Sequence, residues 1–97
     1  MEISKMLTIS TAHITEETNK ILENPHNTLP LVTYNKDGYG WFVYIPEKDF
    51  AHDVKIIKKL PDDLAILFMF ARCHEINIIC LDSDGDEINN LPVYNWF

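Results

Sequence analysis

Two short polar segments hold the residue types that could bind a ligand or transfer a proton. The first, residues 10–15 (S-T-A-H-I-T), joins an expected strand to an expected helix, and the second, residues 82–86 (D-S-D-G-D), follows an apolar run. Hydroxyl groups and an imidazole near a helix N-terminus can bind an anion or support acid–base catalysis. One hypothesis is therefore a small enzyme or ligand-binding domain that uses His13 with Asp82 or Asp84. The residues of this candidate ligand site are Thr11, His13, Asp82 and Asp84.

Both segments also have an ordinary structural explanation. The first fits strand alternation followed by a helix N-cap, and the second fits a solvated turn. Gly85 is misplaced for a calcium-binding EF-hand loop, and no Glu closes such a loop. Cys73, His74 and Cys80 lack the paired spacing of a zinc site. The sequence thus predicts no metal, no cofactor and no catalytic residue.

The chain is acidic, with a formal net charge of −7 from 15 Asp and Glu against 8 Lys and Arg. We expect no direct binding to nucleic acid, because that binding relies on Lys and Arg neutralising phosphate groups. Four of the basic residues lie within residues 48–59, so the rest of the surface is more acidic than the total indicates. This charge provides solubility in one interpretation and docks onto a basic partner in another.

Length and composition predict one globular domain over residues 1–97, because 46% of the residues are hydrophobic. The N-terminus lacks a basic region followed by a long apolar stretch, so we expect no signal peptide. The longest apolar run is too short to span a membrane. We therefore expect a cytoplasmic protein without a membrane partner, in which both cysteines are buried reduced thiols.

The first half of the chain predicts a strand, a helix and a hairpin. Residues 6–12 alternate between polar and apolar side chains, as a half-buried strand does. A helix follows, capped by Thr15 and ending near Glu23. Residues 31–35 and 39–45 flank a K-D-G turn, which predicts a β-hairpin.

The second half predicts a helix and a short strand. Residues 60–75 start with Pro and two Asp and end with Arg and His, which suits the helix dipole. Residues 77–82 predict a short apolar strand. We expect residues 47–59 to form a loop with one or two helical turns. The tail, residues 88–97, is too apolar to remain in solvent.

The element order predicts an α+β domain. It is the β-α-β-β-α-β order of the ferredoxin-like split βαβ fold, with a mixed or antiparallel sheet and an apolar C-terminal tail packed on the domain. In that fold the first and last strands are antiparallel neighbours. We therefore expect His13 and Asp82 at opposite ends of the sheet.

The helix over residues 60–75 is apolar on two faces, and both need a cover. The face expected to meet the sheet is Leu64, Leu67, Phe68 and Ala71. The nearly opposite face is Ile66, Met69, Phe70 and Cys73. Its cover is either the tail from residue 91 onward or another protein, including a second copy of the chain. The candidate interaction surface is Ile66, Met69, Phe70, Trp41 and Trp96.

Five phrases spread over the chain carry a resemblance. They are S-T-A-H-I-T at residues 10–15, Y-G-W-F-V at 39–43, L-P-D-D-L at 60–64, D-S-D-G at 82–85 and L-P-V-Y-N-W at 91–96. Together they resemble a family of small uncharacterised bacterial and mobile-element proteins, a domain of unknown function. The resemblance implies one compact domain and a phage or plasmid setting, and it transfers no activity.

The function that we expect is a non-enzymatic one. The charge, the doubly apolar helix and the aromatic tail favour a small acidic protein–protein interaction or regulatory module. In a mobile element, such a module would act on a basic host or defence protein. The expected partner is a protein, or a second copy of the chain through self-association.

Overall fold

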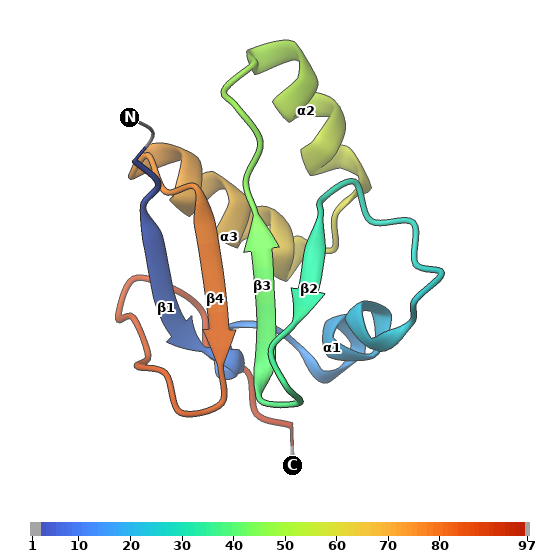
Figure 1. Cartoon of the computed structure of the whole chain (residues 1–97), viewed down its shortest axis with the longest axis vertical. Coiled ribbons are helices and arrows are strands. Elements are labelled where there is room, and N and C mark those ends of the chain that lie inside the picture. Colours follow the sequence, from blue (N-terminus) through green and yellow to red (C-terminus); the bar gives the residue numbers. More distant parts are fainter. Residues whose placement is uncertain (1–2, 97) are drawn as a thin grey trace.

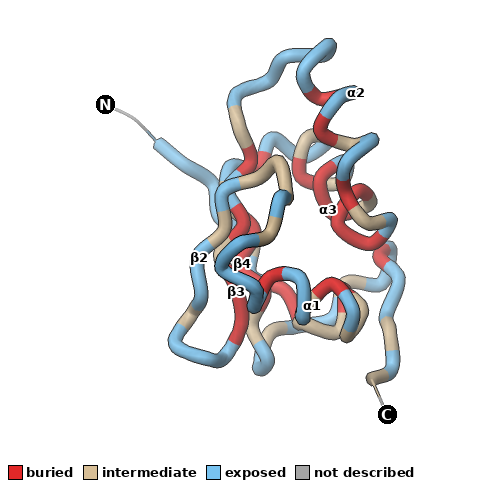
Figure 2. The backbone as a smooth tube through the Cα atoms, turned by 90° about the vertical axis from the view of Figure 1, so that its right-hand side faces the viewer, coloured by how far each residue is buried: buried red, intermediate tan, exposed pale blue. Residues whose placement is uncertain are grey.

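A four-stranded mixed sheet with its helices on one side forms the domain (Figures 1 and 2). The computed structural model describes residues 3–96. The strands, in sheet order, are β1 (Met6–Ser10), β4 (Ile78–Asp82), β3 (Gly40–Tyr44) and β2 (Thr33–Asn35). The helices are the short 3₁₀ helix η1 (Thr11–His13), α1 (Glu16–Glu23), α2 (Phe50–Lys59) and α3 (Asp62–Cys73). The predicted α+β class is confirmed, and so is the packed C-terminal tail.

The direction of β4 differs from the expectation. β1 pairs with β4 in parallel, with Ser10 opposite Asp82, whereas β3 and β4 are antiparallel. The expected antiparallel pairing of the first and last strands was therefore wrong. Its consequence is that the ends of β1 and β4 that precede the two polar segments lie at the same edge of the sheet (Figure 1).

The helix α2 explains this reversal. Residues 47–59 were expected to be mainly loop, but residues 50–59 form a ten-residue helix. In Figure 1 the chain rises through β3, descends through α2 and crosses behind the sheet in α3, so that β4 begins beside the start of β1. Two hydrogen bonds join these starts, from the Asn77 amide to the Lys5 carbonyl oxygen at 2.9 Å and from the Lys5 amide to Asn77 Oδ1 at 2.8 Å. With a single helix between β3 and β4, the last strand would have run antiparallel to β1, as expected from the sequence.

One local feature and two tertiary contacts stabilise α2. Asp49 caps its start, because its side chain accepts a hydrogen bond from the His52 amide at 3.2 Å. Ile56 is buried in the core. Asp53 accepts two hydrogen bonds from the Arg72 guanidinium, at 2.8 and 2.9 Å, and so fastens α2 to α3.

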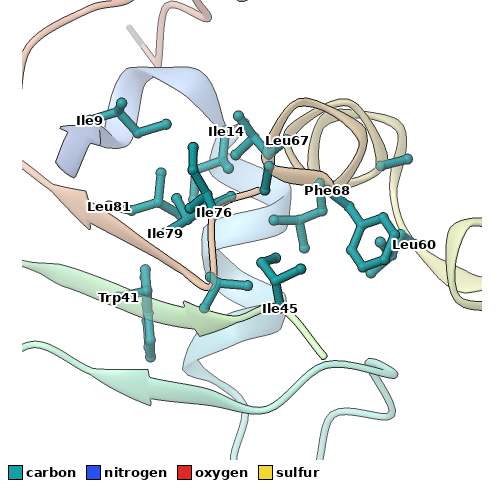
Figure 3. Close-up of a cluster of buried hydrophobic side chains, with 14 of the residues drawn as sticks. Ile9, Ile14, Trp41, Ile45, Leu60, Leu67, Phe68, Ile76, Ile79 and Leu81 are labelled. Atoms are coloured by element: carbon teal, nitrogen blue, oxygen red, sulfur yellow. The ribbon is translucent and has the colours of Figure 1, made fainter. Parts of the chain in front are cut away.

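The core lies between the sheet and α3. The predicted inner face of α3 is fully buried, and Figure 3 shows Leu67 and Phe68 within the cluster of buried hydrophobic side chains. Each such side chain contributes about 1.5–3 kcal/mol by leaving water. The sheet and the neighbouring segments supply the facing residues Ile9, Ile14, Val43, Ile45, Ile76, Ile79 and Leu81.

The tail packs along residues 12–14. Leu91 is buried, the Tyr94 amide donates to the Ala12 carbonyl oxygen at 2.8 Å, and the Trp96 indole donates to the Ile14 carbonyl oxygen at 3.0 Å. The tail therefore covers the junction between β1 and α1. Among the described residues, no helix is long and apolar enough to cross a membrane.

Candidate functional site

The two polar segments lie side by side at the edge where β1 and β4 end. The Ser10 amide donates to the Asp86 carbonyl oxygen at 2.9 Å, and Gly85 packs so closely on Ile9 that an added Cβ would lie 2.5 Å from its carbonyl group. Thr11, His13 and Asp82 thus share one end of the sheet.

His13 is buried where the two polar segments meet, and both of its ring nitrogens form hydrogen bonds with backbone groups of the tail. Its Nδ1 lies 2.8 Å from the Pro92 carbonyl oxygen, and its Nε2 lies 2.8 Å from the Ile88 amide nitrogen. An amide can only donate, so Nε2 accepts and Nδ1 carries the proton that is donated to Pro92. Only 1% of the residue is exposed. His13 therefore fastens the tail to the domain, with neither ring nitrogen left for a substrate.

The Asp82 carboxylate also has hydrogen-bond partners within the domain. Its Oδ2 pairs with the Lys36 ammonium, and its Oδ1 accepts the Asp84 amide hydrogen at 2.8 Å. The Lys36 hydrogen bond, followed by that from the Asp84 amide, holds the pKa of Asp82 below its ordinary value. The same pair raises the pKa of Lys36, whose ammonium also lies 6.0 Å from the centre of the Phe42 ring. The Asp82 carboxylate consequently stays ionised and organises the turn, while Asp84 is exposed.

Asp63 joins α1 to α3, a role that its sequence position did not reveal. It is buried, and its carboxylate accepts hydrogen bonds from the Thr15 amide at 2.7 Å, the Thr18 hydroxyl at 2.8 Å and the Leu64 amide at 2.9 Å. The sequence placed Asp63 only as a favourable charge at a helix start. Its partners are 45 or more residues away, apart from Leu64, so local pattern could not identify them.

A pocket of about 320 Å³ opens at the same edge, and we call it the edge pocket. It lies between α1, the β2–β3 hairpin, the end of β4 and the tail. It is lined by Thr11, Asn19, Glu23, Asn35, Gly38, Tyr39, Gly40, Trp41, Ser83 and Trp96. The structure thus brings together Thr11 from the candidate ligand site with Trp41 and Trp96 from the candidate interaction surface.

A chain of hydrogen bonds orients the polar wall of the edge pocket. The Trp41 indole donates to Asn19 Oδ1 at 2.8 Å, and Asn19 Nδ2 donates to Glu23 Oε1 at 2.9 Å. Asn19 and Glu23 were not singled out in the sequence. The i,i+4 spacing on a predicted helix was the available signal that they share a face, but nothing local connected them to Trp41.

Carboxylates surround this edge of the molecule. Glu16 and Glu17 line a second hollow, of about 290 Å³, together with Tyr94 and Trp96. Burial, followed by the charges of Asp63 and Asp62, raises the pKa of Tyr94. The acidic side chains of this region are Glu16, Glu17, Glu23, Asp84, Asp86 and Glu87, and we call the region the acidic end.

The two lysines nearest the acidic end each have an acidic partner. Lys36 pairs with Asp82, and Lys20 pairs with Glu16 at 3.5 Å. The exposed positive charges of Lys55, Lys58 and Lys59 belong to α2, and Lys58 and Lys59 line a hollow together with Lys20 of α1.

The remaining predicted surface residues lie elsewhere, on α3. Met69 is half exposed in a groove of about 900 Å³ between α2 and α3, where Phe50 is 82% exposed. Cys73 lines the same groove and is exposed, which corrects the expectation that both cysteines are buried. Ile66 and Phe70 are partly buried against the core. The candidate interaction surface is thus split between the groove and the edge pocket.

The uncovered face of the sheet carries aromatic side chains that the sequence analysis did not single out. The helices lie behind the sheet in Figure 1, and Tyr34, Phe42 and Tyr44 share its other face through the pairing of Tyr34 with Phe42. Tyr34 and Tyr44 contact each other edge to face, with ring centres 5.5 Å apart. The signal was present in residues 39–45, because a strand apolar on both faces in a two-layer fold leaves one face uncovered.

Fold and edge together define a small two-layer α+β domain with an acidic, aromatic-lined end. The chain belongs to a family of unknown function (DUF5983), whose C-terminal domain matches residues 6–96. The resemblance to a domain of unknown function is thereby confirmed. No curated protein and no solved structure matches the chain.

Proposed function

We propose that this domain is a non-enzymatic protein–protein interaction module whose acidic end binds a basic surface of another protein. One observation carries the proposal. Glu23 of α1 lines an aromatic-lined pocket, Glu16 and Glu17 of the same helix line the hollow beside it, and the nearby Lys20 and Lys36 are already paired.

The chemistry of the edge supports binding over catalysis. The ring nitrogens of His13 are both used by tail backbone groups, and Asp82 is used by Lys36 and by the Asp84 amide. A general acid or base must reach the proton that it transfers. The aromatic residues Tyr39, Tyr94 and Trp96, by contrast, belong to the residue types that most often anchor a protein interface.

The arrangement of charge supports a basic partner. Electrostatic attraction between oppositely charged surfaces speeds association and weakens with added salt, because exposed charges are screened over about 8 Å at physiological ionic strength. If the chain comes from a mobile element, as the family resemblance implies, the basic partner would be a host or defence protein.

A capture experiment with two charge-matched variants tests this proposal. The wild-type chain, immobilised, is compared with Asp84→Asn/Glu87→Gln at the acidic end and with Glu47→Gln/Glu75→Gln at the opposite end. Each variant removes two exposed carboxylates, and within the described residues none of the four side chains forms a hydrogen bond. Bound proteins from the native cell are measured at about 0.05 M and about 0.5 M salt.

The proposal expects a basic protein that the wild type and the Glu47/Glu75 variant retain at low salt and release at high salt. The Asp84/Glu87 variant should retain about tenfold less of it. Equal retention at both salt concentrations, or equal loss in the two variants, would contradict the proposal.

A further inference from the structure

We propose that the edge pocket binds one cationic group, a guanidinium or an ammonium, supplied by a basic side chain of the partner. This inference rests on the proposed function and names the chemical group that the acidic end recognises. It follows from the charge, the rigidity, the aromatic walls and the size of the pocket.

The charge of the residues that line the edge pocket favours a cationic ligand. Glu23 is the one ionisable carboxylate among the lining residues, and none of the lining residues is Lys, Arg or His. No described basic side chain pairs with Glu23. A phosphate or carboxylate ligand would meet this negative charge without a compensating positive one.

The exposed Glu23 carboxylate is oriented by one hydrogen bond before any ligand arrives. The Trp41 indole donates a hydrogen bond to Asn19 Oδ1, and Asn19 Nδ2 donates one to Glu23 Oε1 at 2.9 Å. Oε2 is left to accept a hydrogen bond from a ligand. A fixed acceptor binds more tightly than a mobile one, because less side-chain freedom is lost on binding.

Aromatic rings form the other walls. Trp96 is held by its indole hydrogen bond to the Ile14 carbonyl oxygen at 3.0 Å, and Trp41 by its bond to Asn19. Tyr39 is 64% exposed and stands at the rim. The negative face of an aromatic ring attracts a cation within about 6 Å of its centre. A carboxylate beside aromatic rings therefore suits a guanidinium or ammonium group.

The size of the edge pocket favours a side chain over a larger ligand. Its volume of about 320 Å³ is at the lower end of the range of small-molecule sites, roughly 300–1,000 Å³. The end of an Arg or Lys side chain would fit it. The rest of the partner would then contact the carboxylates outside the pocket.

Intrinsic fluorescence tests the inference directly, because both tryptophans of the chain line the edge pocket. The full chain is titrated with Nα-acetylarginine methylamide and Nα-acetyllysine methylamide as side-chain probes and with spermidine as a free polyamine. Methyl glucoside and inorganic phosphate are the neutral and anionic probes. Ionic strength is kept constant with sodium chloride throughout.

The inference expects a saturable change in fluorescence with the two blocked amino acids, at about millimolar affinity, and none with the sugar or phosphate. Glu23→Gln should weaken this binding about tenfold. Glu47→Gln removes the same charge at the opposite end of the domain, outside the edge pocket, and should leave this binding unchanged. Tyr39→Leu, at the exposed rim, should weaken it without disturbing the core.

Three results would overturn the inference. They are an equal response to methyl glucoside, equal weakening by Glu47→Gln and Glu23→Gln, and a response to spermidine alone, which would make a free polyamine the ligand. The two proposals fail separately. If the probes do not bind while captured protein still depends on Asp84 and Glu87, the cation pocket is wrong and the interaction module stands. If the probes bind and no basic partner is captured, the module is wrong.

Discussion

His13 and Pro92 are joined by a 2.8 Å hydrogen bond across 79 positions of the sequence. With the bond from the Ile88 amide to Nε2, it makes one buried imidazole a fastener of the C-terminal tail, beside the hydrogen bonds of Tyr94 and Trp96. A residue that looked like a candidate for acid–base chemistry is thus a structural link between the two ends of the chain.

Removing this fastener should destabilise the domain. We expect His13→Ala to lower the free energy of unfolding by about 2–4 kcal/mol, because it opens a cavity and leaves the Ile88 amide without its acceptor. Urea unfolding and amide hydrogen exchange measure the effect, and exchange should accelerate most in residues 86–96. His26→Ala, at an exposed turn position, is the control and should change little. Equal effects of the two variants would refute the role of His13.

The Lys36–Asp82 pair should give stability a defined pH dependence. The pKa of Asp82 is lowered from 3.8 in the folded state, so its contribution is present above that value and disappears as the pH falls through the folded pKa. The pKa of Lys36 is raised from 10.5, so its contribution is present below that value and disappears as the pH rises through the folded pKa. Between these limits the contribution of the pair should be constant.

Carboxyl NMR measures the acidic limb of this dependence. The Asp82 titration midpoint should lie below 3.8 in the wild type and rise toward 3.8 in Lys36→Met, with the Asp84 amide keeping part of the lowering. Lys20→Met removes a lysine that pairs with Glu16 instead, and it should leave the Asp82 midpoint unchanged. An unchanged midpoint in Lys36→Met would show that the pair does not form in solution.

Two glycines of the hairpin should tolerate alanine differently. At Gly40 an added Cβ would lie 1.7 Å from the Leu81 carbonyl oxygen, so β3 and β4 would have to separate. At Gly38, where φ is +82°, no atom lies within 4 Å of such a Cβ. We expect a loss of about 1–2 kcal/mol for Gly38→Ala from backbone strain and about 3 kcal/mol or more for Gly40→Ala from overpacking. Thermal or urea unfolding ranks the two, and a smaller loss at Gly40 would contradict the close strand contact.

Local pattern was sufficient where an element depends on its own residues. Three predictions of this kind are confirmed. They are the buried inner face of α3, the cap of α1 by Thr15 and the hairpin around the K-D-G turn. In each case, periodicity or a turn residue acts within a few positions. The apolar side chains of the tail correctly predicted that it packs on the domain, but it lies along residues 12–14, whereas Met69 and Cys73 of α3 line the groove beside α2.

Local pattern was insufficient where an element depends on distant partners. Asp53 secures α2 through Arg72, which lies 19 positions later, and no periodicity within residues 47–59 contains that information. Without α2, the direction of β4 could not be inferred either. The edge pocket is a further case, because Thr11, Trp41, Ser83 and Trp96 meet only after the strands have paired.

The parallel pairing of β1 with β4 also affects how the chain is made. Ser10 lies opposite Asp82, so the first strand leaves the ribosome long before its partner is synthesised. Contacts between residues so distant in sequence form slowly, because a large loop must close before they stabilise anything. The hairpin of β2 and β3 can form early, whereas β1 waits unpaired for the last third of the chain. We therefore expect β1 to remain unpaired and exposed during synthesis until β4 has been made.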